Sequence, residues 1–182
     1  QDEKELKGIL LKNRFLQRIY TSTIKTMKDY QKLLTGLAGE CAVMKELCLK
    51  GWCPSMTYNN CPTIDILCYH PESKKTVAIQ VKTVQEKVSG RKIYAFPIMC
   101  NRDNRQSFYK EVSEPFIFVY IDHNNHFRYY ILSKEQFINL SSKIEDDYDN
   151  LPREKELKPN SPMTMPVKCL QSFENQWENI WL

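Results

Sequence analysis

The sequence predicts an α/β or α+β fold in which a sheet is flanked by helices, because helical and extended patterns follow one another along one domain-sized chain. An apolar stripe at helical spacing runs from Met27 to Cys48 and ends before Gly51, a natural helix stop. Short runs rich in β-branched and aromatic residues follow, and a capping-box pair then opens a further helix. With 182 residues, the chain is long enough to bury a core.

Two helices are predicted ahead of the strands. Apolar residues recur at helical spacing over residues 3–20, which predicts a basic amphipathic helix. Thr21, Ser22 and Thr23 offer N-caps for the second helix, which ends at Gly51. We therefore expect residues 1–22 to form a helical extension.

The strands are predicted from runs of β-branched and aromatic residues bounded by polar turns. A polar turn with a proline separates the first two runs, and a polar hairpin-like connection joins the last two. The runs are Ile64–Tyr69, Thr76–Lys82, Lys92–Ile98, Phe116–Ile121 and Phe127–Leu132. Ser133 and Gln136 then have capping-box spacing, so a helix through about Lys143 should complete a core over residues 23–144.

Residues 145–182 are predicted to form an acidic, proline-containing loop and a closing helix. Glu145–Pro166 is polar and holds four prolines, which favours a loop or an extended flap. Apolar residues at helical spacing follow, and we expect that helix to pack on the core. They are Leu170, Phe173, Trp177 and Ile180.

Composition excludes several classes of function. A hydrophobic content of 42% is ordinary for a globular protein, and no apolar run approaches the roughly 18 residues of a membrane span. The seven cysteines include no CxxC pair, which argues against a zinc ribbon or redox motif and indicates a reduced, cytoplasmic protein. No glycine-rich phosphate loop is present, so no nucleotide cofactor is expected. The first residue is Gln rather than Met, which leaves open that the chain is a piece of something longer.

Basic residues are concentrated in the middle of the chain, although the net charge is only +4. Seven of them, against two acidic residues, lie from Lys82 to Lys110. A basic stretch suits a phosphate backbone, and a solvated surface loop has the same appearance in sequence.

Two consecutive predicted strands, Ile64–Tyr69 and Thr76–Lys82, contain charged residues among apolar ones. In Thr76–Lys82 the apolar residues alternate with the others, so Gln80 and Lys82 share the face opposite the core. Asp65 stands between two isoleucines, where a carboxylate needs a cation or strong donors. In a hairpin it approaches the Gln80 and Lys82 face. Carboxylate and carboxamide oxygens suit Mg²⁺, and a lysine beside the metal can orient or deprotonate an attacking water.

A further carboxylate, Glu40, is predicted on the helix ahead of the strands. It follows Gly36-Leu37-Ala38-Gly39, whose two glycines would allow the helix to lie close to a neighbour.

Together these residues resemble the PD-(D/E)XK nuclease superfamily, the restriction-endonuclease-like fold that also includes Holliday-junction resolvases. The resemblance covers roughly residues 35–143. It rests on Glu40, on Ile64-Asp65 with Pro62 shortly before, and on Gln80-Val81-Lys82. It implies a restriction-endonuclease-like core, in which helices flank a mixed central β-sheet with a central hairpin, and extra helices at both ends of the chain.

The resemblance also implies a metal-dependent endonuclease that hydrolyses DNA with Mg²⁺ or Mn²⁺. Carried over, Asp65 and Gln80 become metal ligands, the Val81 carbonyl a third ligand, Lys82 the catalytic lysine, and Glu40 an outer ligand or a water-positioning group. The family usually has an acid where this chain has Gln80, although restriction enzymes resembling Mrr carry Gln-x-Lys there. The alternative is a catalytically degenerate module that binds nucleic acid or a protein partner, with Lys82 and Asp65 in a structural salt bridge.

Further residues are candidates for nucleic-acid contacts. The alternative for each is that it belongs to an ordinary strand edge or basic loop and binds nothing. The expected partner is duplex or branched DNA, and because cutting both strands usually takes two sites, a homodimer is also expected. The candidate contacts are Thr83, Gln85, Lys87, Arg91, Lys92, Arg102 and Arg105.

Overall fold

The computed structural model describes residues 14–57, 61, 63–86, 93–150 and 162–181. The chain divides into two compact units, residues 1–35 and 36–182. The described part of the first unit is helical and belongs to α2 (Arg14–Leu49), which continues into the second unit. Within the described residues, no helix has the length and apolar character needed to cross a membrane.

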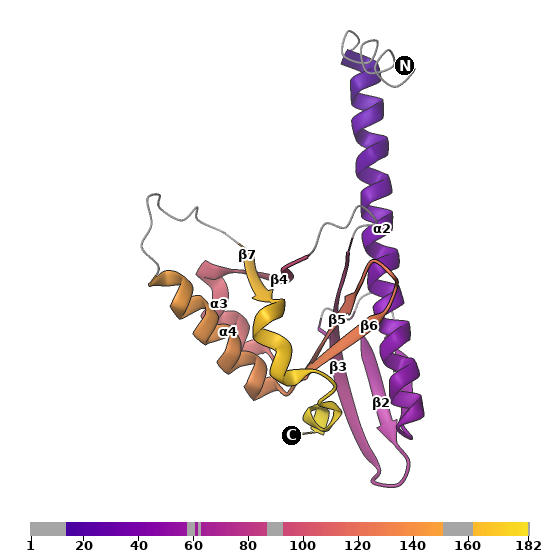
Figure 1. The fold of residues 1–182 in the computed structure, drawn as a ribbon, viewed down its shortest axis with the longest axis vertical. Coiled ribbons are helices and arrows are strands. Elements are labelled where there is room, and N and C mark those ends of the chain that lie inside the picture. Colours follow the sequence, from indigo (N-terminus) through magenta and orange to yellow (C-terminus); the bar gives the residue numbers. More distant parts are fainter. Residues whose placement is uncertain (1–13, 58–60, 62, 87–92, 151–161, 182) are drawn as a thin grey trace. The chain divides into compact units, whose positions relative to one another are not determined.

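The second unit is built on a five-stranded sheet with the strand order β1-β2-β3-β5-β6. Figure 1 shows β2, β3, β5 and β6 of this sheet. Only the β3–β5 pair is parallel, and the other neighbours are antiparallel. The predicted α/β class with a mixed central sheet is therefore confirmed. The strands are β1 (Cys53–Met56), β2 (Ile66–His70), β3 (Lys75–Gln85), β5 (Phe116–Ile121) and β6 (Phe127–Leu132).

The central strand β3 pairs with two partners in succession. Its first half is antiparallel to β2, with Ile79 opposite Ile66, and its second half is parallel to β5, with Gln80 opposite Phe116. β3 is longer than the predicted Thr76–Lys82 because it serves both partners. The change of partner occurs between Ile79 and Gln80, and the predicted catalytic lysine, Lys82, follows two residues after Gln80.

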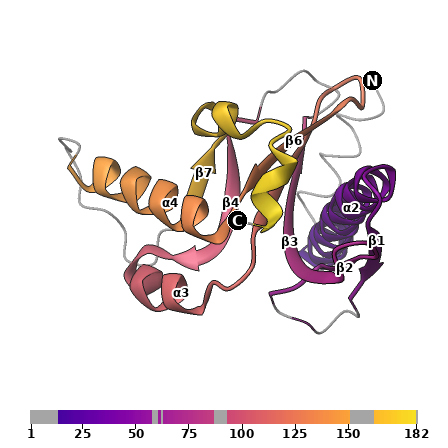
Figure 2. The same ribbon diagram turned by 90° about the horizontal axis from the view of Figure 1, so that it is seen from below.

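One face of the sheet is covered by the second-unit part of α2 (Figure 2). Val43 and Leu47 of α2 are fully buried against Ile66, Ile79 and Val81 of the sheet. The predicted stripe matches the packed face of this helix only in part, since Leu37 and Cys41 are exposed while Met44 packs against the core. The periodicity prediction was based on the larger apolar residues. The buried residues in the second-unit part of α2 are instead Gly39, Val43 and Leu47, which are spaced four residues apart.

The opposite face is covered by α3 (Arg105–Glu111) and α4 (Lys134–Asp149), together with a second sheet of two strands. The two strands are β4 (Ala95–Asn101) and β7 (Pro162–Pro166). Phe137 of α4 stacks on Phe116 of β5 with 3.8 Å between ring centroids, and Phe96 of β4 meets Phe118 at 5.0 Å. The sheet is thus flanked by helices on both faces, as predicted.

The break expected near residues 21–23 is absent, because α2 is one helix through this point. Serine and threonine disfavour a helix only weakly, and no proline or glycine interrupts the chain here, so their capping role is not used. The first thirteen residues of the expected extension lie outside the described part of the chain.

The chain after β6 differs from prediction in three places. The capping box of Ser133 and Gln136 is present as expected, but α4 continues to Asp149 rather than ending near Lys143. The expected flap contains β7, which pairs antiparallel with β4. The expected C-terminal α-helix is instead two 3₁₀ helices, η2 (Val167–Phe173) and η3 (Trp177–Trp181), separated by Asn175 at φ 57°. A residue in the left-handed region cannot lie inside a right-handed helix.

The elements β1 and α3 were also not predicted. Both are short, and β1 depends on antiparallel pairing with β2 rather than on a pattern of its own. Asp65 lies just before β2, which begins at Ile66, rather than inside a strand as the sequence suggested.

Candidate active site

Asp65 is held by hydrogen bonds from three directions at the start of β2. Its backbone N–H donates to the Ile79 carbonyl at 3.0 Å, and its carbonyl accepts from the Thr57 N–H at 3.0 Å. Its carboxylate oxygen Oδ2 accepts from the Val81 N–H at 2.7 Å. The short distance is typical of a charge-assisted bond to a carboxylate, so one oxygen of Asp65 is fixed against β3.

The change of partner in β3 explains this bond. The Gln80 N–H donates to the Pro115 carbonyl beside β5, so the next residue, Val81, directs its N–H and carbonyl toward the β2 side. Because β2 begins only at Ile66, the Asp65 carboxylate takes the place of a backbone partner there. The Val81 carbonyl points to the same side as its N–H, toward Asp65.

Gln80 and Lys82 lie on the face predicted for them. Ile79 and Val81 are buried in the core that β3 shares with α2, and strand alternation places Gln80 and Lys82 together on the opposite face. Lys82 follows two residues later on that face and is only partly exposed.

Glu40 is brought to this site by a close contact between α2 and β3. A Cβ built on Gly39 would lie 1.9 Å from Thr83 Oγ1, so only a glycine permits this approach. The other glycine of the predicted pair, Gly36, has open space around it. The sequence prediction of a close helix approach is therefore confirmed for Gly39 alone.

The charges of Glu40, Asp65 and Lys82 interact with one another. Burial raises the pKa of Glu40, the Asp65 carboxylate raises it further, and Lys82 opposes both effects. Burial lowers the pKa of Lys82, and the charges of Asp65 and Glu40 oppose that effect. Among the described residues no direct ion pair joins Lys82 to either carboxylate, so the direct salt bridge of the alternative interpretation is not present.

The oxygen atoms available to a metal here are few. Among the described residues, no three His, Cys, Asp or Glu side chains form a group able to hold a metal ion. The two carboxylates are those of Glu40 and Asp65, and further oxygens come from the Gln80 amide and the Val81 carbonyl. All four are hard oxygen donors of the kind that Mg²⁺ takes, with water completing its shell.

Of the seven predicted nucleic-acid contacts, only Thr83, Gln85 and Arg105 have described side chains. The Thr83 hydroxyl is buried against α2 and has no hydrogen-bond partner in the described structure. Gln85 is exposed and donates to Asn125 Oδ1 at 3.3 Å. Arg105 forms an ion pair with Asp149 at 2.9 Å, which ties α3 to α4. Outside the described residues lie Lys87, Arg91, Lys92 and the Arg102 side chain.

Thr57 is a site residue that the sequence did not reveal. Its N–H bonds Asp65, and its hydroxyl donates to the Ile64 carbonyl, so it holds the segment that carries the carboxylate. An isolated threonine after a short strand carries no signal for such a role.

Comparisons with known proteins include a distant structural likeness. No protein-family model and no curated protein matches the chain. Among solved structures, Hjc, a Holliday junction resolvase from the archaeal hyperthermophile Archaeoglobus fulgidus, is similar with 13% identity and a TM-score of 0.38. The alignment covers 75% of this chain and 93% of that chain. A likeness this distant does not identify a function, so function is inferred below from the residues themselves.

Proposed function

We propose that this protein is a metal-dependent endonuclease that hydrolyses phosphodiester bonds of DNA. The observation that carries the proposal is that three residues from separate segments act on each other's surroundings: the charges of Asp65 and Lys82 act on the pKa of Glu40, and those of Asp65 and Glu40 act on the pKa of Lys82. Two carboxylates and a partly buried lysine are a costly combination for a structural site, and perturbed groups of this kind are concentrated at functional sites.

Each residue has a distinct task in this proposal. The Val81 N–H fixes one oxygen of Asp65 and leaves the other oxygen for a ligand. Burial lowers the pKa of Lys82, so this lysine loses its proton more readily than an exposed one. The neutral amine can then act as a general base and take a proton from the attacking water. When protonated, it offsets the charge that builds up on the phosphate.

In this proposal a divalent cation would be held by Asp65 and Glu40, with the Gln80 amide oxygen and the Val81 carbonyl as neutral ligands. Bound there, Mg²⁺ or Mn²⁺ would supply Lewis-acid polarisation of the scissile phosphate. The like-charge interaction that raises the pKa of Glu40 supports this assignment, because a cation would relieve it. Gln80 contributes no charge, so the hold on the metal depends on two carboxylates alone.

The proposal is tested by incubating the protein with supercoiled plasmid and with labelled single-stranded DNA in Mg²⁺, Mn²⁺ or EDTA. Asp65→Asn retains an oxygen that can accept from the Val81 N–H, so it removes the charge while keeping the hydrogen bond. Lys82→Ala removes the amine. Lys45→Ala is the matched control, since this lysine lies on α2 and is 67% exposed.

We expect nicking that needs metal, persists in Lys45→Ala and is lost in both site variants. If the protein binds DNA but neither it nor the control cleaves in any metal, the nuclease proposal is wrong. That result would favour the non-catalytic binding module, with Gln80 as the residue that replaced an essential acid.

We also propose that the protein forms a homodimer through the first unit. Large apolar side chains of α2 are exposed there, including Met27 at 61%, Tyr30 at 61% and Leu33 at 64%, with Leu34 beside them. A row of exposed apolar residues on a helix favours burial against a second helix. Light scattering should give twice the monomer mass, and replacing Tyr30 and Leu34 with Glu should reduce it to the monomer; a monomeric wild-type protein would exclude the dimer.

A further inference from the structure

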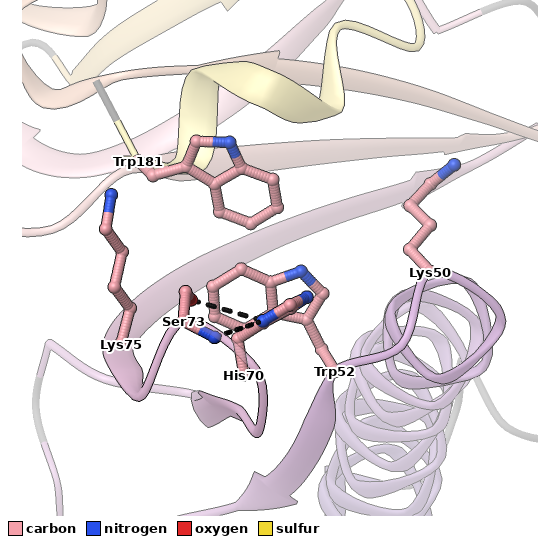
Figure 3. A pocket seen from close by; sticks show the side chains of 6 residues that line it. All are labelled: Lys50, Trp52, His70, Ser73, Lys75 and Trp181. Atoms are coloured by element: carbon pink, nitrogen blue, oxygen red, sulfur yellow. Dashed lines mark hydrogen bonds between the residues drawn. The ribbon is translucent and has the colours of Figure 1, made fainter.

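A second site candidate lies at the end of the β2–β3 hairpin, away from the carboxylates. A pocket of about 320 Å³ is lined there by side chains from three parts of the chain, the end of α2, the β2–β3 hairpin and η3, shown in Figure 3. We call it the tryptophan pocket, and it is defined by Lys50, Trp52, His70, Ser73, Lys75 and Trp181. Lys75 and Lys82 belong to the same strand and are about 23 Å apart along it, at roughly 3.3 Å per residue, so this pocket is not part of the candidate active site.

The apolar wall of the pocket is a set of rings in fixed positions. Trp52 and Trp181 are stacked with 4.4 Å between ring centroids and 11° between ring planes. His70 meets Trp52 edge to face at 4.7 Å. Because Trp52 is only 6% exposed and stacked, the wall does not need to be organised when a ligand arrives.

The end of α2 holds this wall in place. The Trp52 N–H donates to the Leu47 carbonyl at 3.0 Å, and the Gly51 N–H donates to the Cys48 carbonyl at 3.0 Å. These two bonds form a Schellman motif, and Gly51 adopts the φ of 83° that the motif requires. The motif turns the chain so that Lys50 and Trp52, on either side of the glycine, both line the pocket.

The charged groups of the pocket are two lysine ammonium groups, which are hydrogen-bond donors. Lys50 and Lys75 are exposed, and in the described structure neither ammonium is paired with a carboxylate. The Ser73 N–H donates to His70 Nδ1 at 3.2 Å, so in the neutral ring the proton is on Nε2, which is therefore a donor. The lining includes no carboxylate.

We propose that the tryptophan pocket binds a nucleoside phosphate, with the phosphate between the two lysines and the planar base against the indoles. A phosphate monoester carries a charge near −2 and several acceptor oxygens, which match two ammonium groups and one N–H. Aromatic side chains favour a flat aromatic ring as the neighbouring group, and the volume is at the small end of the range for ligand sites. The same chemistry is found in a free nucleotide and in the phosphorylated end of a nucleic-acid strand.

The experiment is isothermal titration calorimetry of the full chain in EDTA, with dAMP, deoxyadenosine and inorganic phosphate as separate probes. We expect dAMP to bind more tightly than either fragment. The Lys50→Gln/Lys75→Gln variant should weaken dAMP binding at least about tenfold, since each lysine makes a charge-assisted contact. Lys45→Gln, on the same helix outside the pocket, should bind like the wild-type protein. Thermal unfolding of each variant verifies that it is folded.

Three outcomes would overturn the proposal: no dAMP binding at millimolar concentration, equal binding of dAMP and deoxyadenosine, or equal binding of dAMP and phosphate. Competition by 5′-phosphorylated against 5′-hydroxyl oligonucleotides then distinguishes the two sources. Displacement by the phosphorylated strand alone indicates a strand end, and displacement by neither indicates a free nucleotide. Because the assay is done without metal, its result does not depend on whether the protein is a nuclease.

Discussion

Replacing Gly39 with alanine tests whether the contact between α2 and β3 positions Glu40. The new methyl group would lie 1.9 Å from Thr83 Oγ1 and 2.8 Å from Thr83 Cβ and Cγ2. Thr83 is a short, β-branched residue inside a strand, so it has no flexible end that could move aside. The helix and the strand must therefore separate, and Glu40, the next residue, moves with the helix.

The magnitude follows from two opposing effects. Overpacking of this kind typically destabilises a protein by about 1–3 kcal/mol. Alanine also stabilises a helix interior by about 0.5–1 kcal/mol relative to glycine. Gly36→Ala is the matched control, because it makes the same change in the same helix with nothing within 4 Å. The difference between the two variants thus isolates the clash, at about 1–3 kcal/mol.

Urea unfolding of the wild-type protein and both variants measures this difference, and plasmid nicking measures the effect on the site. We expect Gly36→Ala to be slightly stabilised and fully active, and Gly39→Ala to be destabilised and to lose activity at temperatures where it remains folded. Adding Thr83→Ala to Gly39→Ala removes the closest atoms and should restore part of the stability. If Gly39→Ala is as stable as Gly36→Ala, the close contact does not exist as described.

Three further predictions concern single side chains. Burial lowers the pKa of Lys82 in the folded protein, so its contribution to stability is fully present above its ordinary value of 10.5 and is lost as the pH falls; Lys82→Met should therefore have a higher Tm than the wild-type protein at neutral pH, and the two should converge above pH 10.5. The raised pKa of Glu40 has the opposite effect on the pH dependence: its contribution to stability is present below its ordinary value of 4.5 and is lost as the pH rises through the folded value. The Tm of Glu40→Gln should therefore rise relative to that of the wild-type protein over this range, and a constant difference would contradict the prediction. Arg128 binds Glu174 through two parallel bonds of 2.8 and 2.7 Å, so Arg128→Ala should cost about 1 kcal/mol in chemical denaturation, and Arg128→Lys, which has no planar fork, should not recover all of it.

Local patterns in the sequence predicted the parts of the fold that depend on local interactions. The bounds of β5 and β6 match their predicted runs, because their β-branched and aromatic residues end at polar turns. The capping box at Ser133 was identified because its two bonds join residues three positions apart. The unbroken course of α2 was missed because three hydroxyl residues imitate a cap.

Elements that depend on distant partners were not predictable in the same way. β7 begins and ends with proline and becomes a strand only by pairing with β4, which is far away in the chain. At the candidate site, strand alternation predicted the face on which Lys82 lies, and the position of Asp65 between two isoleucines predicted that its carboxylate needs a partner. The hydrogen bond from the Val81 N–H to Asp65 was not predictable, because it depends on β2 beginning only at Ile66 and on β3 pairing with β5 from Gln80 onward. The tryptophan pocket had no sequence signal because its lining comes from scattered positions.

The successive pairing of β3 has a consequence for the order in which the protein folds. β2 and β3 are consecutive in the chain, so their hairpin closes a short loop. β3 and β5 are separated in the chain by β4 and α3, so their pairing closes a much longer loop. Short loops lose less entropy on closure, and contacts between distant residues form more slowly. Asp65 and Val81 are therefore expected to meet early, while Trp181, near the end of the chain, completes the tryptophan pocket late. A nascent chain would hold its candidate catalytic carboxylate in place before the second pocket exists.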